Sequence, residues 1–173
     1  MDMRKKVLGT EHPDTFLTMG NLAVTYSNLG KWNGAEQLEI QVFDMSRKPL
    51  GAEHPDTLWT MGNLAITYTK QGKLNEAEQL EVQVLDMRKK VLGAEHPDIL
   101  WTMRNLAVTY SNLRKWNEAE QLEVQVLDMS KKLLGAEHPE TLRSMGNLAF
   151  IHKSKKSVKF RMRQFKFHIQ ERN

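Results

Sequence analysis

The sequence predicts an all-α protein, an α-solenoid built from stacked antiparallel helix pairs. The string Glu-His-Pro occurs four times at a spacing of 42 residues, beginning at Glu11, Glu53, Glu95 and Glu137. Residues 51–92 and 93–134 differ at ten of their 42 positions, and a period of this length is typical of repeat arrays. Apolar residues within each unit recur at three- and four-residue spacings, which favours helices over strands.

The composition is that of a globular protein. The chain has 173 residues, of which 40% are hydrophobic and 27% charged, and no stretch approaches the ~18 consecutive apolar residues of a membrane span. The segment 1–9 lacks the apolar core of a secretory signal. Cysteine is absent, which excludes disulfides, thiolate metal sites and cysteine nucleophiles. A cytoplasmic location is the expectation that agrees with this composition.

The net charge of +4 is unevenly distributed along the chain. Residues 153–173 contain eight Lys or Arg and one Glu, so this tail carries +7 and the remaining 152 residues carry −3. The basic character therefore belongs to the tail, and it does not indicate a nucleic-acid-binding array.

Each unit is predicted to contain two helices, called A and B. In the unit 51–92, helix A begins at Pro55, which suits a first helical position, and ends before Gly72, which suits a C-cap. Helix B is expected to run from about Asn75, acting as N-cap, to Leu92. Two buried stripes are predicted, one of Met61, Leu64, Ala65 and Tyr68, the other of Ala77, Leu80, Val84 and Met87.

The repeat also defines the domain organisation. Residues 1–8 align with the end of a helix B, and we interpret them as the remnant of a preceding one. The array occupies residues 9–152 as the units 9–50, 51–92, 93–134 and a partial unit 135–152, followed by the divergent basic tail 153–173. Pro49 is expected to shorten the first helix B. Both ends look cut from a longer array.

The motif N-L-A-x-T-Y, followed by G-K-x-x-E-A-E and then L-G-x-E-H-P-D-T, resembles the tetratricopeptide repeat in its 42-residue form. This form is typical of kinesin light chains and of arrays attached to some signalling NTPases. The resemblance covers residues 1–151. It includes small residues at Ala23, Ala65, Ala107, Ala149, Ala35, Ala77 and Ala119, and aromatic residues at Tyr26, Tyr68 and Tyr110. It implies a right-handed superhelix with A helices on its concave face, and a non-enzymatic adaptor function. One departure is Arg114, which replaces the turn glycine Gly72 and is expected to strain that turn.

The candidate groove residues lie on the helix A stripe next to the core stripe. Four asparagines recur on it, and amides can pair with the backbone of an extended peptide or with the neighbouring repeat. Two tryptophans on the same stripe can anchor a partner or fill the gap between adjacent A helices. Trp32 and Trp116, in the turns, are interpreted as packing residues. The candidate groove residues are Asn21, Asn63, Asn105, Asn147, Trp59 and Trp101, with the cations Lys70, Arg104 and Arg143.

The charge pattern suggests the class of partner. No acidic residue follows the first turn of an A helix, whereas acids concentrate on helix B, as Glu76, Glu78, Glu81 and Asp86. The groove is thus predicted to be mildly basic and aromatic, and to favour an acidic or aromatic-bearing peptide. This expectation agrees with the tryptophan-plus-acid peptides that kinesin light chains recognise.

No motif in the sequence indicates catalysis, a cofactor, a metal or a small-molecule substrate. A phosphate-binding glycine loop, a nucleophile elbow and H-E-x-x-H are all missing. The repeated histidines are interpreted as parts of helix-initiating turns, because adjacent repeats would hold them ~10 Å apart, too far to share one metal. These histidines are His12, His54, His96 and His138.

Three alternatives remain beside the adaptor function. The chain can be a fragment of a larger motor-adaptor or NTPase-linked signalling protein. Its tail can bind a membrane or nucleic acid, cover the apolar end of the array as a cap, or have no role; the tail reads either as a helix presenting Val158, Met162, Phe165 and Ile169 on one face, or in part as a strand. Exposed end repeats can also allow self-association.

Overall fold

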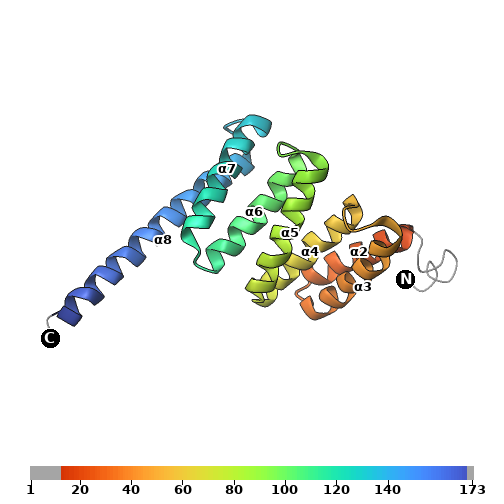
Figure 1. Cartoon of the computed structure of the whole chain (residues 1–173), viewed down its shortest axis with the longest axis horizontal. Helices are drawn as coiled ribbons and strands as arrows, with labels where there is room; N and C mark the ends of the chain where they lie inside the picture. The colour runs from red at the N-terminus through yellow and green to blue at the C-terminus, as the bar shows by residue number, and fades with distance from the viewer. Residues whose placement is uncertain (1–12, 171–173) are drawn as a thin grey trace. The chain divides into compact units, whose positions relative to one another are not determined.

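A computed structural model describes residues 13–170 of the chain, with side chains described for residues 15–159. This part of the chain contains seven helices and no strand. It divides between Thr109 and Tyr110 into two compact units. Figure 1 shows the helices in chain order, and none of those described is long and apolar enough to cross a membrane.

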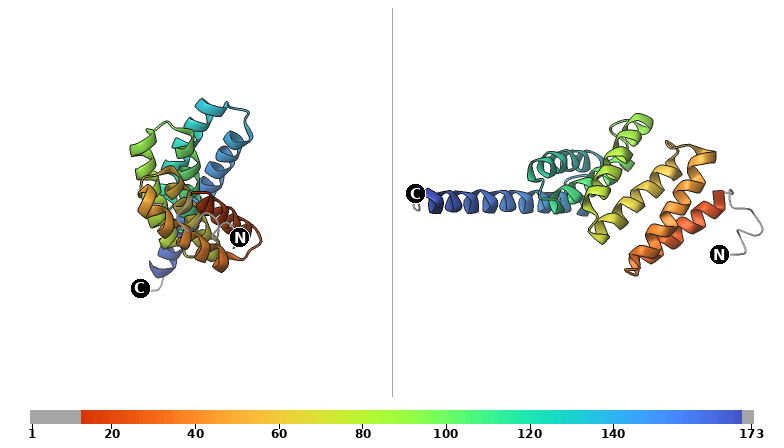
Figure 2. Two further views of the ribbon diagram at one scale, coloured as in Figure 1. Left: turned by 90° about the vertical axis from the view of Figure 1, so that its right-hand side faces the viewer. Right: turned by 60° about the horizontal axis from the view of Figure 1, so that its bottom comes forward.

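The first unit consists of consecutive helix pairs. Its helices are α2 (Pro13–Asn28), α3 (Trp32–Leu50), α4 (Pro55–Gln71), α5 (Leu74–Leu92) and most of α6 (Pro97–Asn112). Helix α3 packs on α2 and α4, and α5 packs on α4, so that successive helices lie side by side (Figure 2). The α-solenoid of stacked antiparallel helix pairs is therefore confirmed. Helices α2, α4 and α6 are A helices, and α3 and α5 are B helices.

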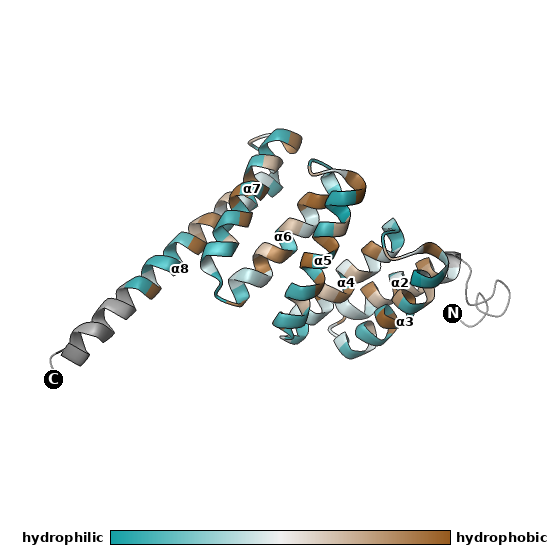
Figure 3. Cartoon of the chain, in the orientation of Figure 1, coloured by the Kyte–Doolittle hydropathy of each residue, from teal (hydrophilic) through white to brown (hydrophobic). Residues whose placement is uncertain are grey.

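The core of the first unit repeats with the sequence. Phe16 and Met19 of α2 pack against Val42 of α3. One repeat later, Leu58 and Met61 of α4 pack against the equivalent Val84 of α5. Figure 3 shows apolar and polar residues interleaved along each helix, as amphipathic helices that bury one face require. Helices α2 and α4 are thus each covered by the B helix that follows them.

The histidines initiate A helices, as predicted. His54 lies at the N-cap of α4, and its Nδ1 accepts a hydrogen bond from the backbone N–H of Asp56 at 3.2 Å. His96 accepts from Asp98 N–H in the same way, also at 3.2 Å. In the last repeat, His138 accepts from Glu140 N–H; His12 lies outside the described residues. A ring nitrogen here satisfies a backbone donor that the first helical turn leaves free.

Two details of the B helices differ from expectation. Helix α5 begins at Leu74 after Lys73, without a side-chain cap, so the prediction of Asn75 as N-cap is wrong. The prediction that Pro49 shortens the first B helix is also wrong, because α3 and α5 have the same length of 19 residues. Pro49 stands one residue from the helix end, where its missing N–H removes a single intrahelical hydrogen bond.

The turn after each A helix requires a left-handed residue. Gly30 and Gly72 have φ of 72° and 79°, and Arg114 has φ of 58° at the equivalent position. This conformation costs a residue with a side chain roughly 1–2 kcal/mol, whereas glycine adopts it freely. Arg114 thus adopts the left-handed conformation on which the predicted strain depends.

The second unit contains α7 (Trp116–Leu134), a B helix, packed against α8 (Pro139–Gln170). Helix α8 is an A helix that does not stop at the turn position, now Lys156, and it continues to Gln170 as one helix (Figure 1). The strand alternative for the tail is therefore wrong. The carboxylate of Glu120 on α7 pairs with Lys155 and, at 2.6 Å, with His152 Nε2, which connects the two helices.

No B helix follows α8 within the described residues, and its core face is open. Leu142 and Met145 are 50% and 39% exposed, whereas the equivalent Leu58 and Met61 are 1% and 4% exposed. The difference arises because α5 covers the latter two residues.

Candidate functional site

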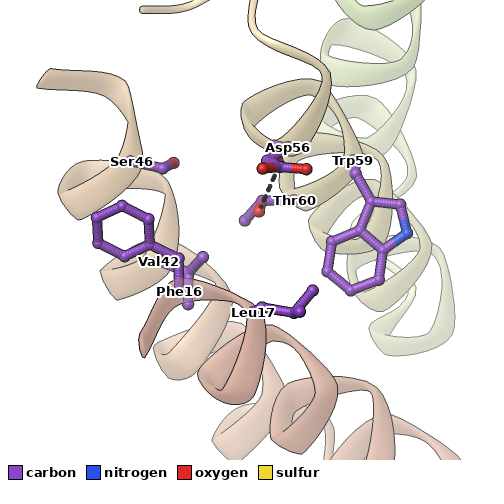
Figure 4. A pocket seen from close by; sticks show the side chains of 7 residues that line it. All are labelled: Phe16, Leu17, Val42, Ser46, Asp56, Trp59 and Thr60. Carbon is purple, nitrogen blue, oxygen red and sulfur yellow. Dashed lines mark hydrogen bonds between the residues drawn. The ribbon is translucent and has the colours of Figure 1, made fainter. Parts of the chain in front are cut away.

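Trp59 stands between two pockets of the first unit. One pocket is enclosed by α2, α3 and α4 (Figure 4), and its lining residues are Phe16, Leu17, Val42, Ser46, Asp56, Trp59 and Thr60. The other pocket is lined by Trp59, Arg88, Asp98 and Trp101, from α4, α5 and α6. The indole of Trp59 therefore forms part of both pockets.

The two pockets are equivalent by the 42-residue repeat. Asp56, Trp59 and Ser46 of the first pocket correspond to Asp98, Trp101 and Arg88 of the second. Two lining positions differ chemically. Arg88 extends from α5 into the second pocket where the first has Ser46, and Trp59 stands in the second pocket where the first has Leu17. The repeated sequence has thus produced two versions of one site, one of them containing an arginine side chain.

Arg88 is held by contacts on several sides. Its Nη1 donates to Thr102 Oγ1 at 2.8 Å and to the Asp98 carbonyl at 3.1 Å. Its guanidinium lies 5.4 Å from the ring centroid of Trp101, a cation–π distance. The side chain is 6% exposed, and burial lowers the pKa of the guanidinium, with the charge of Asp98 acting in the opposite direction.

Both tryptophans also fill the gap between adjacent A helices. A Cβ on Gly20 of α2 would lie 2.7 Å from Cζ3 of Trp59 on α4, and a Cβ on Gly62 would lie 2.9 Å from Cζ3 of Trp101 on α6. Trp59 and Trp101 are nonetheless half-buried rather than buried. The gap-filling alternative is therefore observed, and each tryptophan also lines a pocket; the anchoring of a partner stays a prediction.

The asparagines fall into different environments. In the first unit, Asn21 is exposed and Asn63 and Asn105 are half-buried. Asn147 belongs to the second unit, where its Nδ2 donates to Glu123 Oε1 of the preceding B helix at 3.2 Å. Pairing with the neighbouring repeat is thus observed for Asn147.

The three predicted groove cations also differ. Lys70 is exposed on the last turn of α4. Arg104 is only 9% exposed, and its side chain is engaged within the protein. Arg143, in the second unit, forms an ion pair with Glu140 at 2.8 Å.

Three glutamates on the B helices are buried, which the sequence analysis did not predict. Glu39, Glu81 and Glu123 are 2%, 3% and 1% exposed. Thr67 Oγ1 donates to Glu39 Oε1 at 3.1 Å, and Thr109 donates to Glu81. The signal that could have revealed them is a Glu and a Thr that recur 28 residues apart in two successive repeats.

Burial controls the protonation of two of these glutamates. Desolvation raises the pKa of Glu39 to about 7; the Thr67 hydrogen bond opposes this shift, and the nearby charge of Glu36 adds to it. Desolvation likewise raises the pKa of Glu81 to about 7, opposed by the hydrogen bond from Thr109. Both carboxyl groups connect a B helix to the following A helix, so we assign them a structural role.

Trp32 and Trp116 are the first residues of α3 and α7 and not turn residues as predicted, and their surroundings differ. Trp116 packs edge-on against Phe150 of α8, with ring centroids 6.2 Å apart, which confirms it as a packing residue. Trp32 is 38% exposed and so contributes less to packing than the sequence suggested. Among residues 15–159, whose side chains the structure describes, no group of three or more His, Asp or Glu side chains is arranged to hold a metal ion.

Comparison with known proteins shows what this arrangement resembles. The tetratricopeptide repeat family matches residues 15–56, 57–98 and 99–140. Two crystal structures of a Podosopora anserina protein described as a kinesin light chain with nearly identical TPR-like repeats are 31% identical, with TM-scores of 0.77 and 0.76. They cover 95% of this chain, which spans 78% of theirs. Among curated proteins, no significant match to the chain is found.

More distant structures share the fold alone. BtubC (BKLC) from P. vanneervenii is 18% identical with a TM-score of 0.77, over 86% of this chain and 59% of its own. The apo form of RapI is 13% identical with a TM-score of 0.71, over 87% of this chain and 53% of its own.

Proposed function

Because the chain belongs to the tetratricopeptide repeat family, we propose that it is a non-enzymatic adaptor that binds a partner peptide along its A helices. The observation that carries this proposal is the pair of equivalent pockets on either side of Trp59. Pockets that recur along a groove suit successive side chains of an extended peptide. A half-buried tryptophan between them offers the large, rigid apolar surface that is typical of binding hot spots.

The proposed groove lies in the first unit. Trp59 and Trp101 supply the aromatic surfaces, and Asn21, Asn63 and Asn105 supply amides for the peptide backbone. Lys70 is the exposed cation of this set, and we propose that it attracts an acidic residue of the partner. Arg104 contributes to the fold of α6 rather than to this attraction, because it is buried.

The test is a fluorescence-anisotropy titration with a labelled acidic, tryptophan-containing peptide at low and physiological salt. We expect saturable binding whose affinity falls as the salt concentration rises. Trp59→Ala should lower the affinity by about tenfold or more, as for a hot-spot residue. Trp32→Ala is the matched control, since this tryptophan is the first residue of α3 and lines neither pocket. The proposal is overturned for this class of peptide if folded wild-type protein does not bind it, or if both variants bind equally.

A further inference from the structure

The second pocket shows which group this type of site accommodates. Arg88 occupies it with its guanidinium over the face of Trp101 and with hydrogen bonds to Thr102 Oγ1 and the Asp98 carbonyl. These partners combine an aromatic face with oxygen acceptors, and a guanidinium uses both at once because it is planar, cationic and rich in donors.

The first pocket contains the equivalents of the three residues that contact Arg88 and has no arginine; Leu17 stands in it where the second pocket has Trp59. Trp59, Thr60 and Asp56 occupy the positions of Trp101, Thr102 and Asp98, and Ser46 occupies the position of Arg88. The pocket has a volume of about 190 Å³, well above the ~10–15 Å³ that a cavity needs to hold one water molecule. Figure 4 shows Ser46 and Trp59 on opposite sides of it, with Asp56 and Thr60 between them.

The hydroxyl protons of the first pocket are already used. Thr60 Oγ1 donates to the Asp56 carbonyl at 3.0 Å, and Ser46 Oγ donates to the Phe43 carbonyl at 3.2 Å. Each hydroxyl oxygen then retains acceptor capacity and has no proton left to donate. The carboxylate of Asp56 adds negative charge at the rim. The polar groups of this pocket therefore suit a cationic donor and disfavour an anionic side chain.

We propose that the Ser46 pocket binds an arginine side chain of the partner peptide, in the way that Arg88 occupies the equivalent pocket from within the chain. This inference rests on the proposed peptide-binding function and specifies one anchor residue of the peptide. Lysine fits less well because its compact ammonium cannot stack on Trp59 and reach two separated acceptors as a planar guanidinium can.

The third repeat does not provide a further copy of this site. It has Ser130 at the position of Ser46, but Arg143 replaces the tryptophan. Arg143 is already paired with Glu140, the equivalent of Asp56. A second guanidinium would meet a like charge there instead of an aromatic face. Of the three repeats, only the one that contains Ser46 and Trp59 therefore has the residues of the proposed arginine pocket.

The test uses blocked amino acids as probes, so that it does not depend on finding the natural partner. N-acetyl-arginine methylamide is titrated against ¹⁵N-labelled full-length chain, and the Trp59 indole N–H signal is followed by NMR. The citrulline and lysine methylamides are the ligand controls, because citrulline keeps the shape of arginine and lacks its charge. We expect the arginine probe to bind about tenfold more tightly than the citrulline probe, since hydrogen bonds to a charged donor are the stronger ones.

Two substitutions give each pocket the residue that the other has at this position. Ser46→Arg reproduces the arrangement of the second pocket and should abolish the response at Trp59, whereas Arg88→Ser should create a second response at Trp101. Circular dichroism establishes that each variant is folded, and Thr60→Val, which removes one acceptor, is the substitute if Ser46→Arg fails to fold. Equal binding of the arginine and citrulline probes, or an unchanged Trp59 response in folded Ser46→Arg, would overturn the proposal.

A peptide experiment separates this inference from the proposed function. Any peptide that binds in a Trp59-dependent manner is compared with versions carrying arginine or citrulline at each position in turn. Trp59-dependent binding that arginine does not strengthen at any position contradicts the arginine pocket and leaves the groove function standing. Binding of the arginine probe without binding of any peptide supports the pocket and contradicts the groove.

Discussion

Gly20 of α2 is in direct contact with the indole of Trp59 on α4, so that an added Cβ would lie 2.7 Å from Cζ3. The contact joins two consecutive A helices and also fixes the tryptophan that lines both pockets. It explains why a residue with low helix propensity stands in the middle of a helix.

Gly20→Ala should therefore destabilise the protein by about 1–3 kcal/mol, because the new methyl group overpacks the contact with Trp59. Urea unfolding followed by circular dichroism measures the change in the free energy of unfolding. Gly146→Ala is the matched control: it stands at the equivalent position of α8 with open space around its Cα, and it should be neutral or stabilising by about 0.5–1 kcal/mol. Equal effects of the two substitutions would show that the added methyl group does not overpack the contact with Trp59.

Glu39→Gln should stabilise the protein at pH 8 by up to about 3 kcal/mol. The pKa of Glu39 is raised from 4.5 to about 7 by desolvation, so the folded state binds a proton that the unfolded state has lost between these two values. Stability of the wild type thus falls as pH rises from 4.5 to 7, and it changes little from this source above pH 7.

The measurement is the free energy of unfolding from pH 4.5 to 8 for wild type and variant. The advantage of Glu39→Gln should shrink steadily toward the acidic end, because protonation neutralises Glu39 itself. Glu76→Gln, on an exposed residue of α5, should show no comparable pH-dependent gain. A constant difference between wild type and Glu39→Gln across this range would rule out the titration of Glu39.

Leu58→Ala and Leu142→Ala change the same repeat position in two environments. Leu58 is covered by α5 and 1% exposed, and its truncation should cost about 2–5 kcal/mol. Leu142 is 50% exposed, and its truncation should cost less than about 1 kcal/mol, since little buried contact is lost. Thermal unfolding of both variants compares them directly, and a large loss for Leu142→Ala would indicate that its face is covered in solution.

Arg114→Gly should stabilise the protein by about 1 kcal/mol, because glycine adopts the left-handed conformation of this turn without strain. Gly72→Arg is the reciprocal substitution in a turn of the same geometry, where φ is 79°, and it should destabilise by a similar amount. Chemical unfolding of the two variants gives both values. The explanation by backbone strain fails if they shift stability in the same direction.

The periodicity was sufficient to predict the helix pairs, because a 42-residue repeat with regular apolar spacing is a local signal repeated several times. Glu81 was counted only among the acidic residues of helix B, and its burial was not predicted, because its partner Thr109 lies 28 residues away and no local pattern connects them. The same reason applies to Arg88. Its partners Trp101 and Thr102 come from the next A helix. The signal that could have revealed Arg88 is the repeat position itself, which holds a serine in the other repeats, at Ser46 and Ser130.

The candidate groove was predicted in part. Trp59 and Trp101 lie where the helical stripe placed them, and both line pockets. The stripe could not reveal that Arg104 is buried or that Asn147 is bonded to Glu123, because both depend on how a neighbouring helix packs. Similarly, Pro49 shows that a helix breaker has little effect when it stands at the end of a helix.

Arg88 has a consequence for how a ligand aligns with nearly identical repeats. A shift of 42 residues along the sequence relates the Ser46 pocket to its neighbour. A peptide that binds along such an array would therefore meet two equivalent pockets and could place the same side chain in either of them. If the proposed peptide binding holds, Arg88 would remove this degeneracy, because it occupies one of the two pockets from inside the chain, at an effective concentration that a free side chain does not reach. The serine-to-arginine difference, together with Leu17 in place of Trp59, thus makes two successive pockets of the array distinguishable.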